Sequence, residues 1–275
     1  VFGIVLAILV GLVILGGIKS IASVASKIVP IMAGLYILAG FVVIGAHLGD
    51  LPSAIGTIIS SAFSMSAGIG GLIGGILVGV QRAAFSNEAG IGSASIVQAT
   101  TNTDGPVGTG IVSMLGPFID TIVICNMTAL VIVLTGVYTQ ADGLVGVTLT
   151  SMAFESVLPN FKYVLTVAVL LFAYSTMISW YYVGATGFRY IFGQNDKLEN
   201  IFKVFFCTCV VVGSAAELSN LIAFTDAALI SMSIPNIVGL YLFAPEIKRD
   251  VKEYLQSLKL NRDVTPGEAV TVHDE

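Results

Sequence analysis

The sequence predicts an all-α integral membrane protein, and its composition and the arrangement of its apolar residues carry that prediction. Hydrophobic residues make up 56% of the 275 residues, charged residues make up 11%, and the mean hydropathy is +0.95. Soluble domains carry about 25% charged residues, so this chain falls outside that class. The apolar residues form runs long enough to cross a hydrocarbon core of about 30 Å. The net charge of −5 lies largely in the connections and the tail, so nothing indicates a nucleic-acid partner.

The apolar runs define seven candidate membrane spans, followed by a charged tail. The spans are Val1–Gly17, Ile28–Ala46, Gly68–Ala99, Thr109–Val137, Phe161–Tyr182, Ile201–Ala216 and Leu221–Ala244. We therefore expect a transmembrane domain over residues 1–244 and a tail over residues 245–275. Because the first residue is a valine inside an apolar run, we expect the chain to be the C-terminal piece of a longer protein.

Lysine and arginine residues predict the orientation of these spans. They occur in the connections Ile18–Lys27 and Arg189–Asn200 and in the tail, whereas His47–Ala67 and Tyr138–Asn160 have none. The positive-inside rule then places the tail in the cytoplasm and the other two connections outside. Within these outer connections, Leu51–Ser64 and Leu144–Leu158 alternate apolar and polar residues at helical spacing, which predicts short interfacial helices. One of them could instead be re-entrant or a loop.

The third span is too long and too polar to be one regular transmembrane helix. A continuous helix over Gly68–Ala99 would be roughly 50 Å long, and Ser86, Asn87 and Glu88 lie near its middle. We expect a broken helix in which the stretch Arg82–Phe85 ends the first half and Ser86 or Asn87 caps the second, with Glu88 in its first turn. The exposed N–H groups there would suit a substrate carboxylate.

The alternative interpretation of this span is a packing face of small residues. Gly71, Gly75 and Gly79 recur every four residues, as in close helix contacts, and Arg82 and Glu88 could form an internal ion pair. Packing does not explain three consecutive polar residues at mid-depth.

Two further spans carry oxygen-bearing side chains that suit a hard cation such as sodium. In the fourth span, Thr121, Cys125 and Thr128 share one helical face. Asp120 beside them either neutralises Arg82 or takes part in ion or proton coupling. The hydroxyl and carbonyl oxygens of this span suit ordinary interhelical hydrogen bonds equally well.

In the fifth span, the adjacent Ser175 and Thr176 could present two hydroxyl oxygens to a cation. The alternative is that each hydroxyl bonds back to its own helix. Trp180, Tyr181 and Tyr182 either line a site or belong to an interfacial aromatic belt.

No pattern in the sequence predicts an enzyme. The two histidines, His47 and His273, lie far apart, and no zinc-protease helix, nucleophile elbow or phosphate-binding loop is present. Cys125, Cys207 and Cys209 lie in apolar runs without partners for a zinc site, so we expect packed free thiols.

Four ordered blocks of residues are specific enough to identify a family. The most specific block is Phe85-Ser86-Asn87-Glu88-Ala89-Gly90-Ile91-Gly92-Ser93-Ala94. The other blocks are Gly16–Ala22 with Val29–Ala33 and Tyr36, then Asp120-Thr121 with Cys125 and Thr128-Ala129, and finally Phe172–Thr176 with Trp180 and Tyr182. Together they resemble the sodium:alanine/glycine symporter family, the amino acid carrier proteins. The resemblance extends from residue 1 to about Phe243.

The resemblance implies a leucine-transporter-type inverted-repeat fold, with the seven spans as its fourth to tenth core helices. By resemblance, the unwound stretch that includes Phe85, Ser86, Asn87 and Gly90 contacts the amino acid, and Trp180 borders it. Ser175 and Thr176 would ligate the coupling sodium, and Thr121 would contribute to a second ion site. The remaining ligands belong to core helices that precede this chain, so we expect that the chain cannot transport alone.

The chain departs from the family pattern at several positions. Ala83 follows Arg82 where the family has glycine, and Ser95 stands where a proline is usual. Tyr181 and Ala185 replace a serine and a glutamate after the tryptophan, so we expect substrate identity and gating to differ there.

Taken together, the sequence predicts sodium-coupled symport of a small neutral amino acid, alanine or glycine, across the plasma membrane by alternating access. The alternatives are an amino-acid transporter coupled to protons or uncoupled, and a channel-like or structural membrane subunit.

Overall fold

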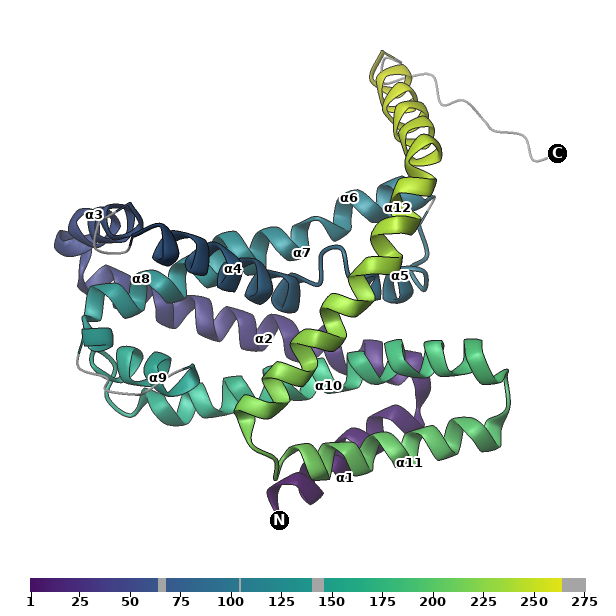
Figure 1. Cartoon of the computed structure of the whole chain (residues 1–275), viewed down its shortest axis with the longest axis horizontal. Helices are drawn as coiled ribbons and strands as arrows, with labels where there is room; N and C mark the ends of the chain where they lie inside the picture. Colours follow the sequence, from purple (N-terminus) through teal and green to yellow (C-terminus); the bar gives the residue numbers. More distant parts are fainter. Residues whose placement is uncertain (64–67, 104, 140–145, 264–275) are drawn as a thin grey trace.

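The computed structural model describes residues 1–63, 68–103, 105–139 and 146–263, and helices make up almost all of this part (Figure 1). No strand occurs among these residues. The α-helices are α1 Phe2–Leu15, α2 Gly17–Ala46, α3 Leu51–Ala62, α4 Gly68–Asn87, α5 Ser93–Gln98, α6 Pro106–Ser113, α7 Leu115–Pro117, α8 Asn126–Thr135, α9 Val147–Glu155, α10 Phe161–Phe192, α11 Asp196–Gly213 and α12 Leu218–Asp263. Two short 3₁₀ turns, Leu48–Asp50 and Val137–Thr139, and a π-helical segment, Phe118–Cys125, complete the described elements.

In the described part of the chain, four helical stretches are long and apolar enough to cross a membrane. They are Gly17–Ala46, Pro106–Thr135, Phe161–Phe192 and Leu218–Leu258. The other three predicted spans correspond to α1, which has 14 residues, to the interrupted pair α4 and α5, and to α11, which begins with charged residues. The all-helical membrane class is thus supported, whereas the number of seven spans stays a prediction.

Two predicted connections are helical instead. The stretch Ile18–Lys27 forms the first turns of α2, and α10 continues through Arg189 to Phe192. The chain turns at Gly17 and at Gly193, whose φ angles of +66° and +83° are unfavourable for residues with side chains. Because α2 begins already at Gly17 and α10 ends only at Phe192, both helices are longer than the predicted spans.

The two stretches that we predicted as interfacial helices are helical, as α3 and α9, and their position in the membrane interface stays a prediction. Ser64, Leu144 and Val145, which we assigned to them, lie outside the described residues. In α9, Ala153 and Phe154 are fully buried, and the Phe154 ring lies 5.4 Å from that of Tyr36 on α2. One face of α9 therefore packs on the helical core, as the amphipathic pattern predicted.

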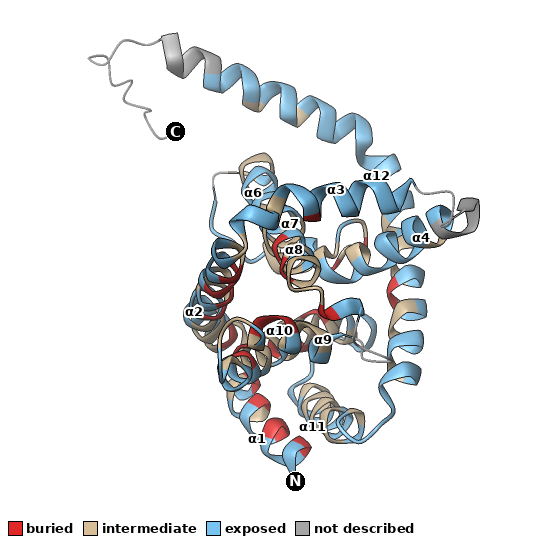
Figure 2. Ribbon diagram, turned by 90° about the vertical axis from the view of Figure 1, so that its left-hand side faces the viewer, coloured by how far each residue is buried: buried red, intermediate tan, exposed pale blue. Residues whose placement is uncertain are grey.

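The buried core consists of two clusters, both built on α2 and α10. One joins them to α8 and α9 around Val43, Val131 and Phe154, and the other joins them to α1 and α11 around Val10 and Ile178. Figure 2 shows the buried positions concentrated in these helices, while α3, α4 and α12 are largely exposed. The exposed side chains of α4 and α12 are mostly apolar, as expected for helices in a lipid environment.

The last helix is continuous across the predicted boundary between membrane domain and tail. It has 46 residues and includes Pro235 and Pro245. Figure 1 shows it crossing the other helices diagonally and extending beyond them. The residues after Asp263, which we expected to complete the tail, lie outside the described part of the chain.

Candidate functional site

The predicted broken helix is present, and its interruption lies at Glu88–Gly92, called the break below. The first half, α4, continues through Arg82–Phe85 and ends at Asn87, and the second half, α5, begins at Ser93. Glu88, Gly90 and Gly92 have φ angles of 57°, 82° and 95°, so three of the five residues of the break are left-handed.

The position of the break corrects the predicted capping. The Asn87 side chain does not cap the second half-helix; its Oδ1 accepts a hydrogen bond from the Ala89 N–H at 3.0 Å and turns the chain out of the first. Glu88 lies in the break itself, and its carboxylate accepts a hydrogen bond from the Ser93 hydroxyl. Because Ser93 is fully buried and Ile91 is 3% exposed, the break is anchored in the fold at both residues.

The end of α4, directly before the break, lies against the π-helical segment Phe118–Cys125. Ser86 Oγ donates to Asp120 Oδ2 at 2.5 Å, and Asn87 Nδ2 donates to Thr121 Oγ1 at 3.1 Å. Polar residues of the third and fourth predicted spans therefore contact each other beside the break. A π-helix is rare, and where it occurs it often marks a functional site.

The same π-helical segment overturns the prediction that Thr121, Cys125 and Thr128 share a face. Its wider turn rotates Thr121 relative to the residues that follow. Thr121 meets Asn87, whereas Thr128 forms a 2.7 Å hydrogen bond with the Tyr36 hydroxyl of α2, and Cys125 is exposed.

Arg82 has a partner that the sequence interpretation missed. It forms an ion pair with Asp226 of α12, not with Glu88 or Asp120, so both pairings that we considered for it are wrong. The Asp226 side chain is 18% exposed. A single acidic residue within the apolar run Leu221–Ala244 was the signal that could have identified it.

Among the described glycines of α4, Gly75 and Gly79 do not form a packing face. A Cβ added at Gly75 or Gly79 would meet nothing within 4 Å. The side-chain surroundings of Gly71 lie outside the described residues. Close packing of small residues therefore does not explain this part of the helix within the chain.

The polar groups at the break line a cavity of about 590 Å³, called the break cavity. Its walls come from the end of α4, the break, α5, the helices before the π-helical segment, and α12. It includes Ser86, Asn87, Gly90, Asp120 and Asn236. Its volume falls in the range typical of small-molecule sites. Phe85, which we predicted as a substrate contact, is 48% exposed and does not line it.

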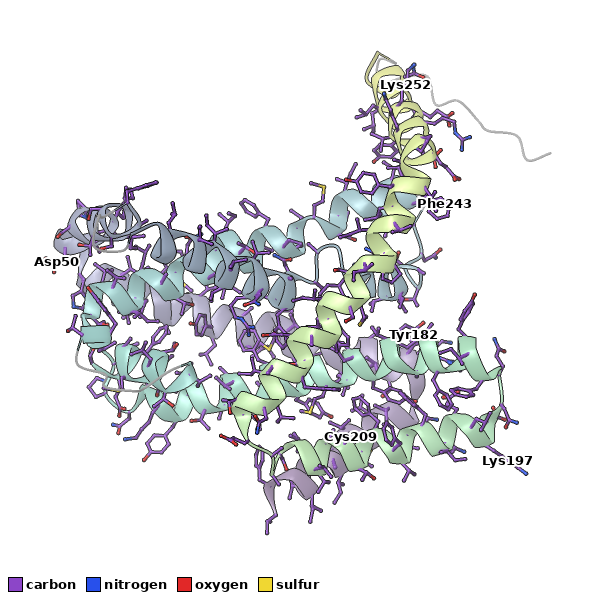
Figure 3. All side chains as sticks on the ribbon, in the orientation of Figure 1. Asp50, Tyr182, Lys197, Cys209, Phe243 and Lys252 are labelled. Atoms are coloured by element: carbon purple, nitrogen blue, oxygen red, sulfur yellow. The ribbon has the colours of Figure 1, made fainter. Side chains whose placement is uncertain are left out.

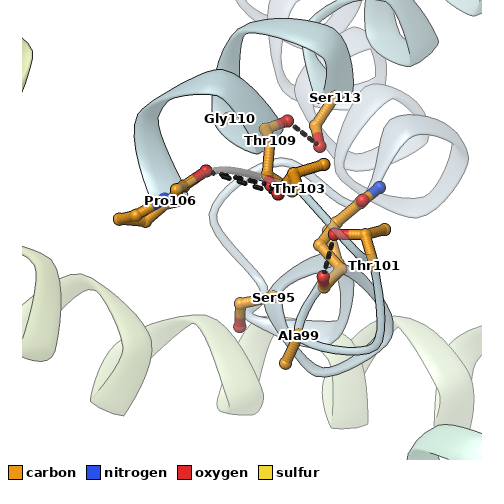
Figure 4. Close-up of a pocket in the computed structure, with 11 residues that line it drawn as sticks. Ser95, Ala99, Thr101, Thr103, Pro106, Thr109, Gly110 and Ser113 are labelled. Atoms are coloured by element: carbon orange, nitrogen blue, oxygen red, sulfur yellow. Dashed lines mark hydrogen bonds between the residues drawn. The ribbon is translucent and has the colours of Figure 1, made fainter. Parts of the chain in front are cut away.

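A second cavity, of about 580 Å³, adjoins the first (Figure 4). The two share Ala94, Ser95, Gln98, Gly110 and Ser113 in their walls. Hydroxyl groups of Thr101, Thr103 and Thr109 add to its polar lining. The two cavities therefore adjoin between the break and the connection that joins α5 to α6.

The predicted cation ligands of α10 are not brought to the break cavity. Ser175 is 6% exposed, and its hydroxyl donates to the Phe172 carbonyl at 2.9 Å and faces Met32 of α2. Thr176 donates to the same carbonyl at 2.9 Å and is exposed. Both hydroxyl hydrogens are thus bonded to their own helix, as the alternative interpretation had it, while oxygen lone pairs remain for a cation.

The aromatic residues after Ser179 divide between two environments. Tyr181 is 3% exposed, and its ring lies 5.4 Å from Phe206 and 5.9 Å from Phe202 of α11. It faces away from the break, so our expectation that it affects substrate identity is not supported. Trp180 is half-buried and lines neither cavity.

A resident metal site does not occur in the described part of the chain. No group of three or more histidine, cysteine, aspartate or glutamate side chains gathers there. The three cysteines form no disulfide, but Cys125 and Cys209 are exposed, whereas we expected packed thiols. A sodium ion that crosses with an amino acid is cargo and needs only transient oxygen ligands.

Comparisons with known proteins agree with the resemblance in the sequence. The sequence model of the sodium:alanine symporter family matches residues 1–266. The sodium/alanine symporter AgcS of Methanococcus maripaludis is 41% identical over 255 residues, which are 92% of this chain and 56% of that protein. The amino-acid carrier protein AlsT of Bacillus subtilis is 35% identical over 96% of this chain and 56% of its own length. The probable sodium/glutamine symporter GlnT of Bacillus subtilis is 32% identical over 95% of this chain and 55% of its length. The chain thus spans about half the length of these relatives.

Proposed function

Since the chain belongs to the sodium:alanine symporter family, we propose that it supplies one half of the substrate path of a sodium-coupled symporter for a small neutral amino acid. The family is one of transporters, so the chain is part of a multi-pass membrane transporter and not an enzyme. Alanine or glycine is the substrate that we propose.

The observation that carries this proposal is the break with its cavity. The left-handed residues of Glu88–Gly92 interrupt regular helical bonding, and the break lines a cavity of about 590 Å³. The Ala89 and Ile91 N–H groups bond locally to Asn87 Oδ1 and the Glu88 carbonyl. An amino-acid carboxylate would meet the remaining N–H groups of the break, and its ammonium group would meet oxygen atoms of Ser86 and Asp120. We propose Ser86, Asn87 and Gly90 as the substrate-binding residues, with Phe85 and Trp180 at the border of the site.

The sodium sites that we propose use oxygen atoms of Ser175 and Thr176, with Thr121 as a ligand of a second ion. The hydroxyls of Ser175 and Thr176 keep free lone pairs after bonding to Phe172. Their separation from the break cavity means that further ligands must come from elements outside this chain. Binding of sodium there would couple α10 to those elements and favour closure around the amino acid.

We propose the topology that the charges predict, in which the connections that carry lysine and the tail lie on the cytoplasmic side. Figure 3 shows Asp50 and Lys197 at opposite ends of the molecule. With Lys197 and Lys252 in the cytoplasm, α3 and α9 lie on the outer surface of the plasma membrane. We propose the leucine-transporter-type arrangement of seven spans, with alternating access as its mechanism.

The test is uptake of radiolabelled alanine by proteoliposomes containing the complete transporter, with and without an inward sodium gradient. Thr176→Ala should abolish the sodium dependence. Thr166→Ala is the matched control, because Thr166 is an exposed residue on the same helix with the same backbone bond, to the Lys162 carbonyl at 2.7 Å. Equal uptake with and without sodium would overturn the coupling, and no uptake of alanine or glycine would overturn the substrate.

Proton coupling is the second candidate, and Asp120 is the observation that favours it. This carboxylate lies at the break cavity and accepts a hydrogen bond from Ser86. A titratable group beside the substrate can carry a proton across with it. Uptake driven by an inward proton gradient without sodium, and lost in Asp120→Asn, would favour this candidate over sodium.

A further inference from the structure

The last helix, α12, contacts the broken helix on both sides of its interruption. Before the break, Asp226 forms the ion pair with Arg82 of α4. At the break, Asn236 of α12 bonds to Gly90. Figure 1 shows α12 passing across α4 and α5 where these contacts occur. No part of our sequence interpretation assigned a role to either residue of α12.

The contact of Asn236 is with the backbone of the break. Its Nδ2 donates to the Gly90 carbonyl oxygen at 2.9 Å. The same carboxamide lies against Gly92, where an added Cβ would come within 2.8 Å of Oδ1 and 3.0 Å of Cγ. The side chain therefore fits a surface that exists only because Gly92 has no side chain.

The Gly90 carbonyl needs such a donor because the left-handed conformations of Gly90 and Gly92 take it out of helical bonding. Their φ angles are 82° and 95°. A partly buried carbonyl group without a hydrogen-bond donor is unfavourable. Because glycine is conformationally free, Gly90 and Gly92 would allow the break to adopt many other backbone conformations. The bond from Asn236 selects the one seen here. Asn236 also lines the break cavity, so the conformation that it selects shapes the cavity wall.

We propose that Asn236 is a positioning residue of the substrate site, which holds the break in its binding conformation through the Gly90 carbonyl. This inference rests on the function proposed above and adds to it a residue from a different helix. Loss of the hydrogen bond lowers the population of the binding conformation, and the apparent affinity falls by the same factor. Loss of one neutral hydrogen bond changes the equilibrium constant between the binding conformation and the others by a factor of about five.

The experiment compares Asn236→Leu, which keeps the branched shape of the side chain but removes the donor, with wild type in the complete transporter. We expect the KM for sodium-dependent alanine uptake to rise, by at most about fivefold, with kcat unchanged. We also expect backbone amide exchange in Glu88–Gly92 to become about fivefold faster. Asn236→Ala is the second variant, because a smaller side chain removes the donor without any clash against Gly92.

Asn220→Leu is the matched control, since Asn220 lies on the same helix and its Nδ2 bonds to Glu217 at 3.2 Å, away from the break. Both readouts should stay at their wild-type values in this variant. Unchanged KM and unchanged amide exchange in both Asn236 variants would overturn the positioning role. If wild type shows no sodium-dependent uptake, the proposed function fails, and amide exchange still decides whether Asn236 holds the break.

Discussion

The same substitution, tyrosine to phenylalanine, at Tyr181 and at Tyr36 measures how a buried hydroxyl group affects stability with and without a hydrogen-bond partner. Both residues are buried, at 3% and 8% exposure. The Tyr36 hydroxyl bonds to Thr128 at 2.7 Å, whereas the Tyr181 hydroxyl has no donor or acceptor among the residues that the structure describes. Replacement of each tyrosine by phenylalanine keeps the ring and removes only the hydroxyl.

The two variants should change stability in opposite directions. Burial of a hydroxyl without a partner costs about 1–3 kcal/mol, which Tyr181→Phe removes while the rings of Phe202 and Phe206 keep their contacts. Tyr36→Phe loses an interhelical hydrogen bond, which is worth about 0.6 kcal/mol on average within membranes. With a shift of about 2–4 °C in Tm per kcal/mol, Tyr181→Phe should raise Tm by at least about 2 °C and Tyr36→Phe should lower it by about 1–2 °C.

The assay is thermal unfolding of the protein in detergent, followed by circular dichroism at a helical wavelength, for wild type and both variants under identical conditions. A lower Tm in Tyr181→Phe, equal to that in Tyr36→Phe, would refute the reasoning, because it would mean that the Tyr181 hydroxyl makes a stabilising bond. Alanine uptake in the complete transporter should be unaffected by Tyr181→Phe, since this residue faces α11 and not the break.

Four other substitutions test backbone and charge contacts of the fold. Gly92→Ala should lower Tm and uptake, since its φ of 95° costs about 1–2 kcal/mol for a residue with a Cβ. Gly79→Ala, in open space within a helix, should instead raise Tm slightly. Gly40→Ala should lower the free energy of unfolding by about 1–3 kcal/mol, because its Cβ would come within 2.8 Å of Met127 Cγ. An unchanged Tm would show that the Met127 side chain moves aside without cost. Asp226→Asn should reduce membrane insertion of α4, because Arg82 without its counter-charge costs about 2.5 kcal/mol at mid-membrane. The yield of folded protein measures this effect, and a yield equal to that of wild type would exclude a role for the ion pair in folding.

Local sequence information predicted that the helix is interrupted but not where the interruption begins and ends. Glycines and consecutive polar residues within an apolar run predicted an interrupted helix, and the interruption lies within a few residues of the expected place. Its exact limits were not predictable, because Ser86 and Asn87 can either extend one helix or cap the next. The left-handed Glu88 and the turn formed by Asn87 decide between these possibilities.

The polar residues of the fourth and fifth spans show where a helical-face argument fails. Spacing grouped Thr121 with Thr128 on the assumption of a regular α-helix, and the π-helical segment separates them. Spacing also could not tell whether the hydroxyls of Ser175 and Thr176 face a cation or their own backbone. Both bond to the Phe172 carbonyl, and any cation would need ligands beyond those of α10.

The membrane class, the family and the existence of a polar interruption could be read from the amino-acid sequence, because composition, local motifs and backbone preferences are properties of neighbouring residues. Which residues meet across the fold depends on how the helices pack. Arg82 pairs with Asp226, 144 positions away, and Asn236 holds Gly90 from 146 positions away. Several acidic and amide residues in the chain could have filled these roles equally well by chemistry. The choice among them depends on which helices lie side by side, and that is set by the packing of the whole chain.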